Sequence, residues 1–238
     1  MTTYVLVHGA WSGAHGFRDV RRLLQAQGHE VFTPALTGIG ARVHLASPQI
    51  TLDTHIQDVV NLILYEDLRD IVLLGFSYGG MVVTGALAHI AERVSHLVYL
   101  DAFVPANGQS VMDLVAGRRP PTGLGAPAFL PPAPRAYESA DQQAFHDPRR
   151  VAQPLGTFAQ PVRLSQALEA YPFTRTYIRA TEDDHSAESD QRFAQAATHA
   201  RDSEQWAYHE INTNHMVPMN RPAELAEILM GLDTVNGG

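Results

Sequence analysis

The sequence has no cysteine, and that absence removes several classes of protein at once. Without thiols the chain holds no disulfide framework, no thiolate zinc site and no cysteine nucleophile. Positive charge is also scarce, since 17 Lys and Arg residues stand against 25 Asp and Glu, a formal net charge of −8. Because nucleic-acid binding depends on clustered Lys and Arg, we expect no nucleic-acid partner.

Signals for membranes and export are missing too. The longest apolar stretches, such as Ile71–Leu74, fall far short of the roughly 20 residues that cross a bilayer. The chain begins Met-Thr-Thr and enters the apolar run Tyr4–Val7 directly, with no basic region ahead of a longer apolar one. We therefore expect no membrane partner and a cytoplasmic location.

The remaining composition is that of an ordinary globular protein, with 238 residues of which 45% are hydrophobic and 18% are charged. A chain of this length buries roughly 70–75% of its unfolded surface, so it needs no metal or disulfide to fold. The length fits one large domain or two small ones.

Short apolar runs rich in β-branched residues alternate with longer helical patterns. Most runs lack in–out alternation, which is typical of strands covered on both faces. This order predicts an α/β fold with a six-stranded, mostly parallel sheet flanked by helices. Strands are expected at Tyr4–His8, Glu30–Thr33, Ile71–Phe76, Val94–Leu100, Thr174–Ala180 and Gln205–Ile211. Helices are expected at Phe17–Gln27, Asp53–Leu64, Tyr78–Ala91, Ser189–Ala200 and Pro222–Leu232.

One long segment interrupts this rhythm. About 70 residues separate two strands, and Gly117–Pro134 alone holds six Pro and three Gly. A structureless loop of that length is rare unless it is functional. We predict an α/β core at 1–104 and 172–238 and an inserted cap, or lid, at 105–171, with short helices at Ser139–Phe145 and Leu164–Ala170. A second small domain without a role in binding is the alternative.

The sharpest motif is Gly75-Phe76-Ser77-Tyr78-Gly79, a G-x-S-x-G placed between a predicted strand and a predicted helix. A direct strand-to-helix turn strains its central residue, and neighbours two positions away approach too closely for side chains. The turn exposes the Ser77 hydroxyl at the top of the sheet, where the helix start directs free N–H groups and its positive end at it. We predict that Ser77 is a nucleophile.

A serine nucleophile needs a base, an acid that orients the base, and donors for the oxyanion. His215 lies in a polar loop between the last strand and the last helix, which suits the base. Asp183 follows the strand Thr174–Ala180 and is favoured as the acid; Asp101, after Val94–Leu100, and Asp184 are the alternatives. The backbone N–H groups of Ala10 and Tyr78 are expected to form the oxyanion hole. His8 is read as a structural residue that bonds the loop backbone.

No His, Asp and Glu cluster has metal-ligand spacing, and no glycine-rich phosphate loop is present. We therefore expect neither a cofactor nor a metal.

The chain resembles the small α/β-hydrolases that include plant methylesterases, hydroxynitrile lyases and bacterial esterases. The resemblance rests on Tyr4–Trp11, Gly38–Leu45, Leu97–Pro105, Tyr177–Asp183 and Asn214–Met216, and it fails in the Pro/Gly-rich segment. It implies the α/β-hydrolase fold and places the family's acid on Asp183. Lyases of this kind carry threonine and lysine where this chain has Gly9 and Met216, so the resemblance favours the esterases.

These observations together predict a serine hydrolase that cleaves small carboxylic esters through an acyl-enzyme. Related acyl bonds (carbamate, lactone or amide, including xenobiotic ones) are the alternative, because the same groups attack them all. A non-catalytic ligand receptor is expected to have lost residues of the triad, but Ser77, Asp183 and His215 are all present. Oligomeric state stays open, a homodimer included. Four aromatic residues are candidates for substrate contact: Trp11 and Phe76 beside the motifs, and Phe129 and Phe158 in the predicted cap.

Overall fold

The computed structural model describes residues 1–115, 128–182 and 187–232, without the side chains of 187–192. Its centre is a six-stranded sheet in the order β2-β1-β3-β4-β7-β8, and every neighbouring pair in it is parallel. The predicted sheet is confirmed, and β3, β4 and β7 have the predicted bounds. The strands are β1 (Thr3–Val7), β2 (Glu30–Phe32), β3 (Ile71–Phe76), β4 (Val94–Leu100), β7 (Thr174–Ala180) and β8 (Ala207–Ile211).

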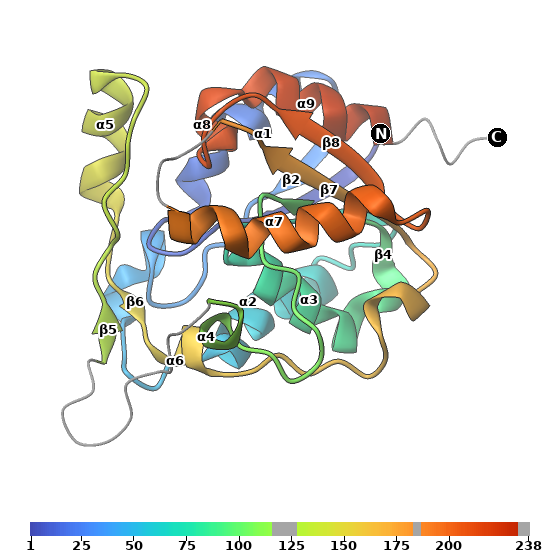
Figure 1. Cartoon of the computed structure of the whole chain (residues 1–238), viewed down its shortest axis with the longest axis horizontal. Coiled ribbons are helices and arrows are strands. Elements are labelled where there is room, and N and C mark those ends of the chain that lie inside the picture. The colour runs from blue at the N-terminus through green and yellow to red at the C-terminus, as the bar shows by residue number, and fades with distance from the viewer. Residues whose placement is uncertain (116–127, 183–186, 233–238) are drawn as a thin grey trace.

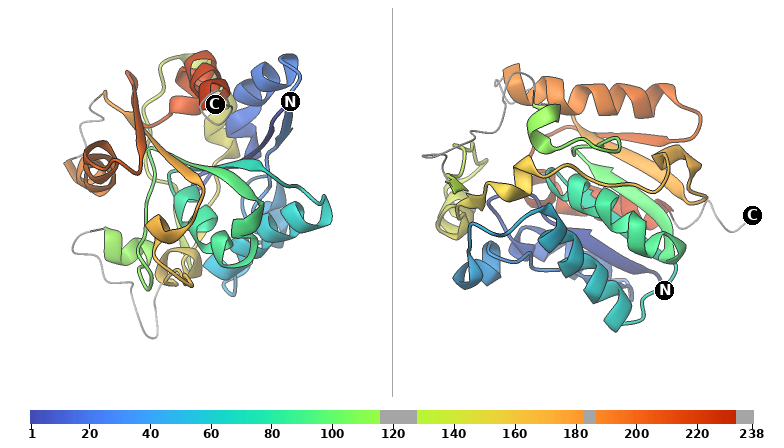
Figure 2. Two further views of the ribbon diagram at one scale, coloured as in Figure 1. Left: turned by 90° about the vertical axis from the view of Figure 1, so that its right-hand side faces the viewer. Right: turned by 90° about the horizontal axis from the view of Figure 1, so that it is seen from below.

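Helices cover both faces of the sheet (Figures 1 and 2). One face carries α1 (Arg18–Ala26) and α9 (Pro222–Gly231), which pack on each other. The opposite face carries α2 (Leu52–Tyr65) and α3 (Gly79–Ile90), with α7 (Ala187–Asp202) beside β7 and β8. This double covering explains why the sequence shows unbroken apolar strands.

The buried side chains form two cores, one on each side of the sheet. In β1, Val5 and Val7 join the core under α2 and α3, while Tyr4 and Leu6 join the core under α1 and α9. Successive strand residues point to opposite faces, so a central strand such as β3 is apolar and buried throughout to serve both cores.

The segment between β4 and β7, residues 105–171, is called the inserted segment below. Its β5, α5 and β6 lie beyond the edge of the sheet where the strands end, on the left of Figure 1, and the chain after α6 runs back toward the start of β7. It contains a small antiparallel pair of β5 and β6. Its elements are α4 (Val111–Leu114), β5 (Phe129–Leu130), α5 (Ala140–His146), η4 (Asp147–Arg149), β6 (Gln153–Pro154), α6 (Gly156–Ala159) and η5 (Leu168–Ala170).

The two short helices predicted in the inserted segment have different outcomes. The prediction at Ser139–Phe145 is confirmed as α5, which Ser139 caps by accepting a hydrogen bond from the Gln142 N–H at 3.1 Å. The prediction at Leu164–Ala170 is wrong except for the final turn, η5. The Leu164 N–H instead donates to the Asn107 side chain at 3.0 Å, so tertiary bonding replaces the first helical turn.

Short elements complete the chain: η1 (Ala14–Phe17), η2 (Gly40–Leu45), η3 (Ala91–Arg93) and α8 (Val217–Asn220). Within the described ranges, no helix has the length and apolar character needed to cross a membrane.

Candidate active site

The turn from β3 to α3 has the tight geometry that its glycines predict. Ser77 has a φ of 57°, in the left-handed region that non-glycine residues rarely adopt. A Cβ atom at Gly75 would lie 2.7 Å from the Gly79 carbonyl oxygen, and one at Gly79 would lie 2.5 Å from the Val7 carbonyl oxygen. Neither position accepts a side chain, which confirms the sequence-based reading of a strained turn that presents Ser77 at the end of the sheet.

The structure brings His215 to this serine. His215 Nε2 lies 3.0 Å from Ser77 Oγ, and its Nδ1 lies 2.6 Å from Asp101 Oδ2. A carboxylate only accepts hydrogen bonds, so the imidazole carries its proton on Nδ1 and donates it to Asp101. Nε2 is then unprotonated and accepts the Ser77 hydroxyl proton, which is the arrangement that general-base activation requires.

Asp101 directly follows β4 and is held in place by several groups. It is 4% exposed, and its φ of 40° is strained. Its N–H donates to the Ile178 carbonyl at 2.7 Å, and Oδ1 accepts the Ala180 N–H at 3.3 Å. Arg179 Nη1 lies 3.5 Å from Oδ1. These contacts leave Oδ2 directed at His215 and balance the buried negative charge.

From the sequence we expected Asp183 to be the acid that orients His215, but Asp183 and Asp184 lie outside the described residues. The Nδ1 contact that the prediction required is made by Asp101, the alternative acid. Nδ1 carries a single proton, so one carboxylate suffices to orient the ring. The sequence did not separate these acids, because Asp101 and Asp183 both follow predicted strands.

Two phenylalanines enclose the His215 ring. Phe76 stacks on one side with ring centroids 4.9 Å apart, and Phe193 of α7 stacks at 5.2 Å with ring planes only 9° apart. This sandwich fixes the plane of the imidazole between Ser77 and Asp101. Phe76 was predicted as a substrate contact, and in the structure it packs on the His215 ring. Phe193 was not predicted, because an aromatic residue in a helix carries no sequence signal for this role.

The loop after β1 lies against the serine turn. A Cβ atom at Gly9 would lie 3.0 Å from Ser77 Cβ, so glycine permits this close approach. In the part of the chain that the structure describes, the N–H groups of Ala10 and Tyr78 donate to no protein acceptor. Both residues therefore offer free donors beside Ser77, as an oxyanion hole needs.

His8 contributes to the loop rather than to the chemistry. Its Nδ1 donates to the Gly9 carbonyl at 2.9 Å, and its Nε2 accepts the Leu36 N–H at 3.4 Å. Burial lowers the pKa of His8 to about 4, so the ring stays neutral. The structural reading of His8 is confirmed.

The other aromatic candidates lie on the inserted segment or face it. The Trp11 and Phe158 rings meet edge-on with centroids 5.4 Å apart, and Phe158 stacks on Tyr78 at 5.5 Å. Phe129, in β5, is half-buried and pairs with Pro154 of β6. Their contact with substrate remains a prediction.

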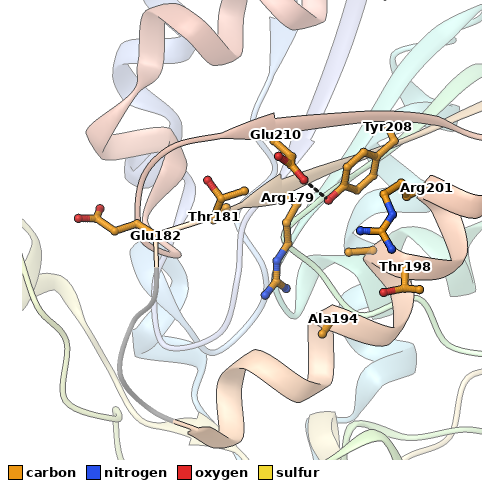
Figure 3. A pocket seen from close by; sticks show the side chains of 10 residues that line it. Arg179, Thr181, Glu182, Ala194, Thr198, Arg201, Tyr208 and Glu210 are labelled. Carbon is orange, nitrogen blue, oxygen red and sulfur yellow. Dashed lines mark hydrogen bonds between the residues drawn. The ribbon is translucent and has the colours of Figure 1, made fainter.

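A polar pocket is lined by Arg179, the residue that also contacts Asp101 (Figure 3). Neither Ser77 nor His215 lines it. Tyr208 donates a hydrogen bond to Glu210 at 2.8 Å across its floor, and Arg201 borders it. Arg179 thus lines this pocket and also lies 3.5 Å from Asp101.

Over residues 1–115, 128–182 and 187–232, no group of three or more His, Asp or Glu side chains is arranged to hold a metal ion.

Comparison with known proteins agrees with this geometry. Residues 4–228 match the alpha/beta hydrolase family. A carbendazim hydrolyzing esterase from Nocardioides sp. (strain SG-4G) is 38% identical over 247 aligned positions, covering 98% of this chain and 100% of the esterase. Pheophorbidase from Raphanus sativus is 27% identical, covering 77% of this chain and 87% of its own.

Among solved structures, the methylesterase MES16 from Arabidopsis superposes with a TM-score of 0.76 at 21% identity. That match covers 99% of this chain and 100% of the methylesterase. At this identity the likeness supports the fold, in agreement with the sheet order and the serine turn. The chain belongs to the alpha/beta hydrolase family.

Proposed function

We propose that this protein is a serine hydrolase that cleaves small carboxylic esters through an acyl-enzyme, with Ser77, His215 and Asp101 as its catalytic triad. The observation that carries the proposal is the pair of contacts made by one imidazole, 3.0 Å to the Ser77 hydroxyl and 2.6 Å to the Asp101 carboxylate. The carbendazim hydrolyzing esterase among the relatives supports ester bonds as the substrate class.

Acylation follows from the proton positions. Ser77 Oγ attacks the ester carbonyl as His215 Nε2 takes the hydroxyl proton, and a tetrahedral oxyanion forms. The N–H groups of Ala10 and Tyr78 donate to that oxyanion, an interaction worth about 3–4 kcal/mol for each donor. His215 then gives its proton to the leaving alkoxide, and the acyl group stays on Ser77.

Deacylation repeats the same steps with water. His215 removes a proton from the water that attacks the acyl-enzyme, and it returns the proton to Ser77 Oγ when the acid product leaves. Asp101 keeps the Nδ1 proton on the imidazole and stabilises the imidazolium in both halves. Each proton transfer in the scheme passes through His215, so the scheme needs no cofactor.

The inserted segment acts as the cap over this site in the proposal. It lies at the edge of the sheet that carries Ser77, and its aromatic residues meet the serine turn through the contact between Phe158 and Tyr78. Phe129, Phe158 and Trp11 are proposed to shape the space for the apolar part of the ester.

Cyanohydrin cleavage is disfavoured by the residues beside the triad. Gly9 and Met216 stand where the lyases of the resembling group carry a threonine and a lysine, and neither can orient a hydroxyl group or stabilise cyanide. Met216 is buried, at 4% exposure, so it adds no charge next to His215.

The test is intact-mass spectrometry after treatment with a fluorophosphonate, beside turnover of p-nitrophenyl butyrate and of carbendazim. Wild-type protein is expected to gain a single adduct and to hydrolyse at least one ester. Ser77→Ala is expected to lose both, with turnover lower by at least 10⁴-fold. A folded wild-type protein with neither adduct nor turnover would overturn the proposal.

A further inference from the structure

Trp11 links the oxyanion loop to the inserted segment by three hydrogen bonds. Its backbone N–H donates to Gln153 Oε1 at 3.1 Å, and its indole N–H donates to the Leu130 carbonyl at 3.0 Å. Its own carbonyl accepts the Val151 N–H at 3.1 Å. Trp11 has a φ of 57°, and a strained residue persists only where its surroundings hold it. Since Trp11 directly follows Ala10, these bonds determine where the Ala10 N–H points.

Gln153 makes the central contact of this link. Its side chain is completely buried, and its Nε2 donates to Thr157 Oγ1 at 2.7 Å. The reverse orientation of the amide would place its NH₂ group against the Trp11 N–H, so that two donors would meet. The network therefore fixes the side-chain oxygen toward Trp11 and the nitrogen toward Thr157.

A second arm runs from α6 to the other oxyanion residue. The Thr157 hydroxyl donates to the Pro154 carbonyl at 2.7 Å, and the next residue, Phe158, stacks on the Tyr78 ring with centroids 5.5 Å apart. Tyr78 is completely buried, and burial raises the pKa of its hydroxyl, which keeps it protonated. The backbone N–H of this same residue is the second proposed oxyanion donor.

His55 of α2 completes the arm from the core side. Its Nε2 lies 2.8 Å from the Thr37 carbonyl, which can only accept, so the ring proton is on Nε2. Burial lowers the pKa of His55 to about 4, so Nδ1 stays unprotonated. Nδ1 then accepts the Tyr78 hydroxyl proton across 3.0 Å. The phenol thus has a fixed donor direction, toward the core.

We propose that Gln153 is a positioning residue for the oxyanion hole, because its amide joins Trp11, next to Ala10, with Thr157, next to the Phe158 ring that stacks on Tyr78. The inference rests on the proposed function of Ser77. It gives the inserted segment a second role besides enclosing the substrate, since any displacement of residues 153–157 shifts both oxyanion donors together.

Oxyanion donors act only when they point at the site where charge develops. Gln153→Met keeps the side-chain length but removes both hydrogen bonds, so kcat for p-nitrophenyl butyrate is expected to fall 10- to 100-fold. KM is expected to change less than twofold, because the ground-state ester does not use the hole. Affinity for a trifluoromethyl ketone, whose adduct on Ser77 carries an oxyanion, should fall by the same factor as kcat.

Gln160→Met is the matched control. Gln160 also ties the inserted segment to the core, accepting the Asp53 N–H at 2.9 Å and donating to its carboxylate at 2.6 Å. Those bonds are exposed at the start of α2 and involve neither Trp11 nor Tyr78. This variant is expected to keep the wild-type kcat and the wild-type affinity for the ketone.

Thr157→Val is the second test, and it serves where Gln153→Met does not fold. It removes the hydroxyl with little change of volume and leaves the bond between Gln153 and Trp11 in place. A three- to tenfold loss of kcat at unchanged KM is expected. The inference is overturned if wild type turns over ester while Gln153→Met and Thr157→Val match the Gln160→Met control in kcat. A wild type without turnover or adduct would instead reject the function of Ser77.

Discussion

The core and the inserted segment meet at the same edge of the sheet, and different interactions hold them. Around Ser77 the backbone itself fixes the geometry, through the positive φ of the serine and the close packing at Gly75 and Gly79. The inserted segment attaches through side chains that bond to the core, such as Gln153 to Trp11 and Gln142 to Asn220 at 3.2 Å, beside a backbone bond from Val151 to Trp11. The backbone of the core positions Ser77, and buried side chains help to position the segment above it.

This comparison predicts unequal effects of substitution. The largest is expected at the serine turn, with Gly79→Ala. The new Cβ atom would lie 2.5 Å from the Val7 carbonyl oxygen and 3.0 Å from the His8 carbonyl oxygen, and neither backbone group can move cheaply. Overpacking of this kind costs about 3 kcal/mol or more of unfolding free energy.

Urea denaturation measures that cost. Gly231→Ala is the matched control, because a Cβ atom there meets nothing within 4 Å, and it is expected to be neutral or slightly stabilising. Equal stability of the two variants would contradict the account of the turn.

The next largest effect is expected in the core at His55, whose ring contacts the Tyr78 hydroxyl and the Thr37 carbonyl. Burial lowers its pKa from the ordinary 6.5 to about 4. Below pH 6.5 the unfolded chain binds a proton that the folded chain does not, so stability falls as the pH drops toward 4 and is unaffected above 6.5. His55 alone contributes up to about 3 kcal/mol to this loss.

The measurement is unfolding free energy in urea from pH 7.5 to 4.5. His55→Gln cannot titrate, so its stability is expected to fall less steeply with decreasing pH than that of wild type. His8 is buried with a similarly lowered pKa and leaves some pH dependence in the variant. Parallel curves for the two proteins would show that His55 is not held neutral.

The smallest effect is expected at the outer contact of the inserted segment. Glu138 and Arg221 form an ion pair at 3.0 Å, with side chains 34% and 37% exposed. Exposed pairs contribute less than about 1 kcal/mol. Glu138→Gln should therefore change neither kcat nor the unfolding free energy beyond that amount, in activity and denaturation assays. A larger loss would mean that this pair, rather than the buried amides, holds the segment.

The same division explains what could be predicted from the sequence. The strands follow from continuous apolar runs, and the serine turn follows from two glycines at fixed spacing. The acid was harder, because Asp101 and Asp183 both follow predicted strands. Only the fold shows that a positive φ at Asp101 and the Ala180 N–H turn its carboxylate to His215. Gln153 has no local signal, since its role depends on a loop 142 residues away.

In the proposed mechanism His215, oriented by Asp101, activates Ser77. The most direct test of this activation is the rate at which a fluorophosphonate labels Ser77, followed by intact mass, in wild type, Asp101→Asn and Asp183→Asn. This rate reports activation of the serine without requiring the natural substrate.

An amide at position 101 can donate to Nδ1, which moves the ring proton to Nε2 and blocks the base. Labelling of Asp101→Asn is expected to be about 10²- to 10⁴-fold slower than that of wild type, with Asp183→Asn at the wild-type rate. Wild-type labelling of Asp101→Asn, together with slow labelling of Asp183→Asn, would contradict the account.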